Sequence, residues 1–216
     1  MISHRPPAEA VETVWIVRHG ERQDYVDPAW KKTATNLDDS PLAELGHKQA
    51  KEVAARLKNE RIDHIFSSPF LRCVQTANHI AEAVRKSVKI ENGICEILWT
   101  FPPGYNDCET LKARFPCVDD TYRSAVVPHR RERYDADCFG RVGEAASKIC
   151  QCFSGSILFV AHGASIAGLL KFYTGTASYV GLCTITKLQK TSDGQWQVEL
   201  LSDSTHLSDR TNLRAY

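Results

Sequence analysis

The 216-residue sequence lacks several features that mark whole classes of protein. No apolar run is long enough to span a bilayer, so we expect no transmembrane helix. None of the eight cysteines forms a C-x-x-C pair, which excludes the spacing of a zinc ribbon. The net charge is only +1, which favours no global attraction to nucleic acid or to a membrane. Any basic function must therefore be local.

The first residues lack the apolar segment of a signal peptide, because residues 1–12 are polar and contain two prolines. We interpret them as a flexible lead-in. Without an export signal, a disulfide framework is not expected at this chain length, and we predict free thiols in a cytoplasmic protein. There is no internal repeat or low-complexity tract, and 43% hydrophobic residues are ordinary for a globular chain. Residues 13–216 are therefore expected to form one domain.

A basic turn follows the first apolar run. Residues 14–17 are apolar and rich in β-branched and aromatic side chains, which predicts a buried strand, and Arg18-His19-Gly20-Glu21-Arg22 comes next. In an open α/β sheet, ligands collect at the carboxyl ends of strands. Two arginines on either side of a histidine favour binding of an anion there. A solvated basic loop is the alternative interpretation of this stretch alone.

A second apolar run ends in the same way, since residues 156–161 lead directly into His162-Gly163. Hydrophobic periodicity predicts alternating helices and strands between and after the two runs. That alternation is typical of an α/β fold with a mainly parallel sheet, in which His19 and His162 would meet at one edge. The predicted helices span 42–58, 69–84 and 137–153, a further helix follows Gly163 to about residue 173, and a short helical stretch is expected near 109–114. The further strands span 62–66, 88–91, 179–188 and 196–201.

A third arginine is expected at the same edge. Ser68-Pro69 predicts a helix start, with Ser68 as the N-cap and Pro69 in the first helical position. Arg72 then lies in the first turn, where a cation opposes the helix dipole unless an anion binds between them. The alternative is a poorly placed surface arginine. Guanidinium groups match the oxygens of a phosphoryl group bidentately, so the convergence predicts a phosphate pocket.

Glu96 lies among apolar residues after the predicted strand 88–91 and is a candidate proton donor. A structural ion pair is its alternative role.

Residues 99–136 are irregular and contain four prolines. This stretch is too long for a simple connection, and we interpret it as a lid or specificity insert. The basic run 129–133 within it is expected to be a solvated face.

Taken together, these motifs resemble the histidine phosphatase superfamily, which includes the cofactor-dependent phosphoglycerate mutases and the acid phosphatases. More closely, the chain resembles the phosphatase domain of the suppressor of T-cell receptor signalling proteins and the related ecdysteroid-phosphate phosphatase. The matching residues are Val17 to Arg22, Ser68-Pro69, Leu71 to Ala77, Gly93-Ile94, Glu96, Val118-Asp119, Thr121 to Arg123, Val160 to His162, Gly181 and Cys183.

The resemblance implies a three-layer α/β/α sandwich of the phosphoglycerate mutase-like kind. It implies a phosphomonoesterase that works through a phosphohistidine. No cofactor is expected, and no metal ion is expected because arginine supplies the charge that Mg²⁺ would otherwise provide. By position, the implied catalytic residues are the nucleophile His19, the acid Glu96 and a protonated His162, and the implied phosphate-binding residues are Arg18, Arg22 and Arg72.

The implied partner is a phosphorylated protein, such as a phosphotyrosine protein, or a steroid or other small-molecule phosphate. Nucleic acid and membrane are not expected as partners, and a homodimer stays open. Two alternatives to hydrolysis also stay open. One is a phosphoglycerate mutase-like phosphotransferase, and the other is a phosphate-binding scaffold without turnover.

Overall fold

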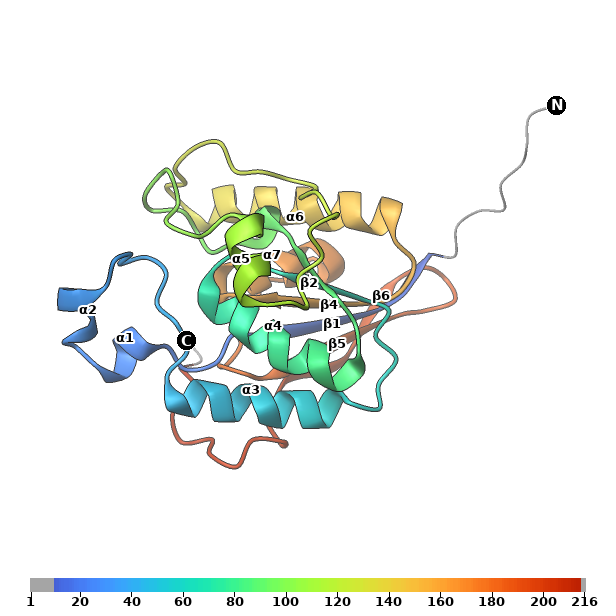
Figure 1. Cartoon of the computed structure of the whole chain (residues 1–216). Helices are drawn as coiled ribbons and strands as arrows, with labels where there is room; N and C mark the ends of the chain where they lie inside the picture. The colour runs from blue at the N-terminus through green and yellow to red at the C-terminus, as the bar shows by residue number, and fades with distance from the viewer. Residues whose placement is uncertain (1–9, 215–216) are drawn as a thin grey trace.

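In a computed structural model that describes residues 10–214, a six-stranded sheet lies between two layers of helices (Figure 1). The strand order is β3-β2-β4-β1-β5-β6. The first four strands along the chain pair in parallel, and the last two join as antiparallel strands at one side. The sheet is therefore mixed and mainly parallel, as expected. The strands are β1 (Val11–Arg18), β2 (His64–Ser67), β3 (Val88–Ile90), β4 (Gly155–Ala161), β5 (Ile185–Lys190) and β6 (Trp196–Asp203).

Strand β1 lies inside the sheet and is covered on both faces. Trp15 and Val17 point into one apolar cluster, whereas Val14 and Ile16 point into the other. Because both faces of the strand are buried, its sequence is a continuous apolar run and does not alternate between apolar and polar residues. Helices α3 (Glu44–Leu57) and α4 (Leu71–Val84) cover the first face, and α6 (Asp135–Cys152) and α7 (Gly163–Thr174) cover the second. The expected three-layer sandwich is confirmed.

The predicted start of α4 is wrong by two residues. Phe70 is the N-cap, with an extended backbone, and the helix begins at Leu71. The cap comes from a distant segment, because the buried carboxylate of Asp39 accepts a hydrogen bond of 2.6 Å from the Leu71 N–H. A negative charge at a helix N-terminus is favourable. Ser68 is therefore not the cap, and its hydroxyl is available for another partner.

Two other boundaries differ from the sequence-based expectation. The strand predicted over 179–188 begins only at Ile185, and the residues before it form a loop. Strand β1 begins at Val11, so the last two residues of the expected lead-in belong to the sheet. Residues 1–9 of that lead-in lie outside the described part of the chain.

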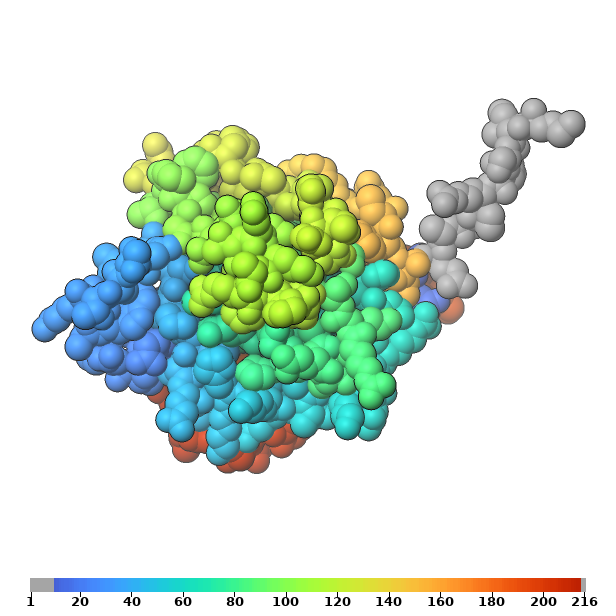
Figure 2. Space-filling model, viewed as in Figure 1, coloured from blue at the N-terminus to red at the C-terminus, as the bar shows by residue number. Residues whose placement is uncertain are grey.

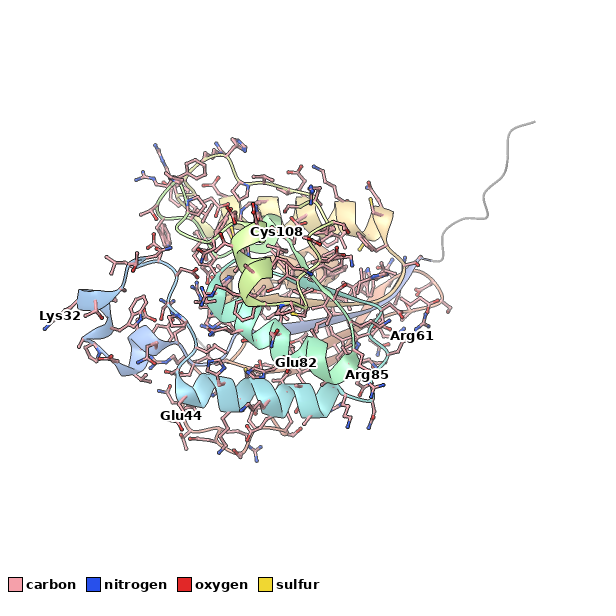
Figure 3. All side chains as sticks on the ribbon, in the orientation of Figure 1. Lys32, Glu44, Arg61, Glu82, Arg85 and Cys108 are labelled. Atoms are coloured by element: carbon pink, nitrogen blue, oxygen red, sulfur yellow. The ribbon has the colours of Figure 1, made fainter. Side chains whose placement is uncertain are left out.

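Segments between the core elements surround one edge of the sheet. Two short helices, α1 (Gln23–Val26) and α2 (Trp30–Thr33), lie between β1 and α3, and they project from the body (Figure 2). Residues 99–136 are irregular except for α5 (Cys108–Arg114), and the 3-10 turn η1 (Asn92–Ile94) precedes them. In Figure 3, Glu82 and Arg85 mark the far end of α4. The first turn of this helix, with Arg72, lies at the opposite end.

All eight cysteines are free, which confirms the expectation of unpaired thiols. Within residues 10–214, no helix is both long and apolar enough to cross a membrane.

Candidate active site

The carboxyl ends of β1 and β4 are adjacent and bring the two histidines together. Arg18 pairs with Ala161 in the parallel register, and the His19 N–H donates to the Ala161 carbonyl at 3.1 Å. The rings of His19 and His162 then meet edge to face, with 5.2 Å between their centroids. Both side chains are buried, at 2% and 0% exposed. The predicted meeting of His19 and His162 is confirmed.

His19 presents one ring nitrogen without a proton. Its Nδ1 donates a hydrogen bond of 2.8 Å to the Gly20 carbonyl, so in the neutral ring Nε2 carries the lone pair. Burial, followed by the positive charges of Arg72 and Arg18, lowers the pKa of His19 well below its ordinary value. The neutral ring is therefore the stable form at pH 7. A side chain at position 20 would lie 2.6 Å from the Gly46 carbonyl oxygen, so the close approach of α3 requires a glycine there.

His162 has a different partner. Its Nε2 shares a hydrogen bond of 2.7 Å with the Ser68 hydroxyl, and the Cys73 thiol lies 3.4 Å from the same nitrogen. Burial and then the charge of Arg72 hold the pKa of His162 well below its ordinary value. The ring is therefore neutral in the protein alone, unlike the protonated form expected from the resemblance. A bound dianion would raise that pKa by replacing repulsion with attraction.

Ser68 is a site residue that the motif analysis missed. A signal was present, because the Ser-Ser-Pro sequence follows the second predicted strand, whose carboxyl end lies at the same sheet edge. The sequence pattern instead predicted that the Ser68 hydroxyl caps the following helix.

Arg18 and Arg72 are both buried, at 3% exposed. Nη1 of Arg18 donates to the carbonyls of Val180 and Arg214, at 2.8 and 2.9 Å. The Arg72 guanidinium lies 4.5 Å above the Phe70 ring, and its Nη1 donates a long bond of 3.3 Å to a backbone carbonyl. Its Nε–H has no hydrogen-bond partner among residues 10–214. A buried cation with an unused donor is the arrangement that a bound anion stabilises.

Arg22 has a carboxylate partner, which the sequence analysis did not foresee. Its Nε and Nη2 donate to the two oxygens of Asp24, at 2.8 and 2.7 Å, and its guanidinium lies 4.5 Å above the Tyr25 ring. These hydrogen bonds outweigh burial and raise the pKa of Arg22. A bound phosphoryl group would share this guanidinium with Asp24 or displace the carboxylate.

Beside these residues lies a cavity of about 280 Å³. Its polar lining includes Arg22, Arg72 and Glu96, and its apolar lining includes Phe70 and Trp99. The two histidines and Arg18 are not among its lining residues. The structure thus places the expected acid and two of the expected arginines at one cavity.

The loop that carries Glu96 is held by a buried ion pair. From α6, Arg141 donates to the carbonyls of Gly93, Cys95 and Glu96, at 2.8 to 3.2 Å. Its Nε also donates to Glu132 at 2.6 Å, and Glu132 in turn accepts from a backbone N–H of the same loop. A structural ion pair was the alternative role expected for Glu96. In the structure, Glu132 forms that ion pair with Arg141. Among the described residues, Glu96 itself forms no ion pair.

The base of the long insert is attached by a second buried carboxylate. Glu91 is fully buried and accepts hydrogen bonds from the Tyr122 hydroxyl at 2.6 Å and from the Ala125 N–H at 2.7 Å. It also accepts from Ser124 and from the Val126 N–H. The insert is therefore fixed at residues 122–126, directly beside the 3-10 turn that leads to Glu96.

Comparison with known proteins decides the family. The model of the histidine phosphatase superfamily (branch 1) matches residues 14–204. The chain belongs to this superfamily. It is 27% identical to human ubiquitin-associated and SH3 domain-containing protein B over 89% of the chain, and it spans 38% of that protein. The probable phosphoglycerate mutase GpmB of Proteus mirabilis is also 27% identical, with 91% of this chain and 95% of GpmB covered.

Among solved structures, the ecdysone phosphate phosphatase of Bombix mori in complex with tungstate has a TM-score of 0.72 and 22% identity. The likeness covers 93% of this chain and 96% of that one, and it shows a shared fold. The family resemblance is therefore confirmed. In this histidine phosphatase chain, the matched range includes every expected site residue, from Arg18 to His162. No group of three or more His, Cys, Asp or Glu side chains that could hold a metal ion occurs within residues 10–214.

Proposed function

We propose that this histidine phosphatase hydrolyses phosphate monoesters through a phosphohistidine on His19. The observation that carries this proposal is a buried, neutral imidazole with an unprotonated Nε2, surrounded by arginines whose charges lower its pKa. A neutral imidazole is nucleophilic, and the nearby cations favour a phosphoryl dianion.

In the first step, Nε2 of His19 attacks phosphorus in line and the bond to the leaving oxygen breaks. Glu96 gives its proton to that oxygen. In the second step, the Glu96 carboxylate takes a proton from water, the water oxygen attacks phosphorus, and the N–P bond breaks. Inorganic phosphate leaves, and Glu96 is again protonated for the next cycle.

The pocket cations stabilise the charge on the equatorial oxygens. We assign this role to Arg18, Arg22, Arg72 and to His162, whose pKa the bound dianion raises so that it is protonated. Arginine then supplies the charge that Mg²⁺ supplies in other phosphoryl transfer enzymes, and we propose that turnover is independent of metal. Activity that survives exhaustive chelation supports this assignment, and restoration by Mg²⁺ after chelation contradicts it.

The mouth of the cavity favours substrates with a planar apolar group. Trp99 lines the cavity and exposes 60% of its surface, and Phe101, two residues further along the chain but not among the lining residues, exposes 43%. Tyr105 packs against Phe70, with 5.4 Å between the ring centroids. The first two aromatics are therefore available for stacking, and Tyr105 is a packing anchor. We propose residues 99–136 as the specificity insert, and phosphotyrosine peptides, steroid phosphates and small metabolite phosphates as the substrate panel to compare.

A rapid-quench experiment with phosphorus-labelled p-nitrophenyl phosphate tests the mechanism. We expect an acid-labile phosphoenzyme in the unaltered protein and none in His19→Ala. His64→Ala is the control, because His64 is a partly buried histidine of the same sheet that lies at the start of β2, away from the site. A fully active His19→Ala would end the proposal.

A mutase is the second candidate function, because GpmB matches this chain over almost its whole length. Both reactions share the phosphohistidine and differ in the final acceptor, which is water in one case and a second hydroxyl in the other. Phosphate release compared with isomerisation of 3-phosphoglycerate separates them. Binding of vanadate with neither reaction would indicate a phosphate-binding scaffold.

We also propose a cytoplasmic location. Its support is the eight free thiols, which suit a reducing compartment.

A further inference from the structure

The segment after β6 returns to the carboxyl end of β1. It passes beneath α3, where the Ser208 N–H donates to Glu52, and then reaches the loop before β5 (Figure 1). There the Leu182 N–H donates to the Leu213 carbonyl at 2.7 Å. Arg214 is thereby placed beside the Arg18-His19 turn.

Arg214 makes three contacts at this turn. Its Nε donates to a carboxylate oxygen of Glu21 at 3.1 Å, and its Nη2 lies 3.0 Å from the same oxygen in an ion pair. Its guanidinium lies 4.3 Å above the Tyr25 ring, and Arg22 stacks on the same ring at 4.5 Å. Its backbone carbonyl accepts from Nη1 of Arg18 at 2.9 Å. One residue therefore contacts the immediate surroundings of two pocket arginines.

The ion pair with Glu21 matters because this carboxylate is buried, at 3% exposed. Within residues 10–214, Arg214 is its only ion-pair partner. Removing one partner of a buried pair leaves an uncompensated charge. Here that charge would be negative and would lie in the turn that holds His19, so it would repel a phosphoryl dianion.

From these contacts we infer that Arg214 is a positioning residue of the phosphate pocket. It does not touch the phosphate. It neutralises Glu21, and it holds Arg18 and the Tyr25–Arg22 stack where an oxyanion meets them. This inference rests on the proposed function of the same pocket, but its test uses anion binding as well as turnover.

The test compares Arg214→Ala with the unaltered protein for vanadate binding by calorimetry and for hydrolysis of p-nitrophenyl phosphate. We expect the Kd for vanadate and the KM to rise roughly tenfold, the lower end of the effect of groups that orient a first layer of ligands. We expect kcat to change less. Arg210→Ala is the matched control, because Arg210 is an exposed arginine of the same segment, and it should leave both constants unchanged.

The charge argument also makes a rescue prediction. In Arg214→Ala/Glu21→Gln, the uncompensated carboxylate is absent, so vanadate affinity should return most of the way to that of the unaltered protein. Arg214→Lys should recover part of it, because lysine neutralises Glu21 but lacks the planar fork. These two variants keep the test decisive if Arg214→Ala does not fold.

Three outcomes decide the matter. An unchanged Kd for vanadate in Arg214→Ala, measured below its unfolding temperature, overturns the inference while the proposed function stands. Weaker vanadate binding without rescue by Glu21→Gln overturns the charge argument. If the unaltered protein binds vanadate but never turns over, the proposed function fails, and a tenfold loss in Arg214→Ala still supports Arg214.

Discussion

Two strand ends in this molecule have the same His-Gly sequence and different hydrogen bonds. At the end of β1, Nδ1 of His19 is engaged by the Gly20 carbonyl. At the end of β4, Nε2 of His162 is engaged by Ser68. Burial and the same arginines lower the pKa of both rings. The difference is therefore that Nε2 is engaged in His162, whereas among the described residues Nε2 of His19 has no hydrogen-bond partner.

From that difference we propose separate roles for the two rings. A nucleophile needs a nitrogen lone pair that no other group occupies, and His19 keeps Nε2 in that state. His162, tied to Ser68, is better suited to hold a proton against an oxyanion once phosphate is bound. The shared dipeptide marks the sheet edge, and the neighbouring groups decide the chemistry.

Alanine at each histidine tests this division most strongly. Loss of the nucleophile should reduce turnover by about 10⁴-fold or more, as for other covalent enzymes. In His162→Ala we expect about 10²- to 10³-fold slower phosphorylation, the size of one lost oxyanion donor. Quenched single turnovers should still trap phosphohistidine in His162→Ala. Phosphohistidine found on His162 in the His19→Ala protein would reverse the assignment.

Arg72→Ala should reduce kcat/KM by about 10²- to 10³-fold, because a preorganised donor to the phosphoryl oxygens is lost. It should also change the pH profile. The charge of Arg72 lowers the pKa of His19, so its removal raises that pKa and moves the acid limb of kcat/KM to higher pH. Lys86→Ala, an exposed cation beyond the far end of α4, is the control. If the acid limb of kcat/KM does not move in Arg72→Ala, the charge of Arg72 does not control the pKa of His19.

Glu96→Gln should affect poor leaving groups more than good ones. Without the acid, we expect about a 10²-fold loss on alkyl phosphates and a much smaller loss on aryl phosphates, whose oxygens leave without a proton. Glu109→Gln, an exposed glutamate of the insert that follows Glu96, should change neither. Equal losses on both substrate classes would remove Glu96 as the acid.

Much of the site could be predicted because strand periodicity and parallel topology act over short, regular distances. Those two rules place His19 and His162 at one edge, and the following helix brings Arg72 there. The helix start could not be predicted by the same means. Ser68 satisfied a local capping rule, but the Asp39 carboxylate, from a segment 32 residues away in the chain, caps the helix instead.

The supporting groups were unpredictable for a related reason. Arg141 is 45 residues from Glu96, and Arg214 is 193 residues from Glu21, so no local pattern connects them. Each is recognisable only when the fold brings a buried charge to its partner. Sequence motifs therefore identify the groups that we propose for phosphate contact better than the groups that orient them.

Ser68→Ala is the smallest change that tests the comparison between the strand ends. We expect about a tenfold loss of kcat/KM, in line with one neutral hydrogen bond, while phosphohistidine still forms on His19. Ser67→Ala is the matched control, because this equally buried hydroxyl bonds the Ser68 carbonyl and does not reach His162. The two variants should lower the unfolding temperature similarly and differ in activity. If they lose activity equally, Ser68 only stabilises the strand end, and the distinct role of His162 must come from its charge environment alone.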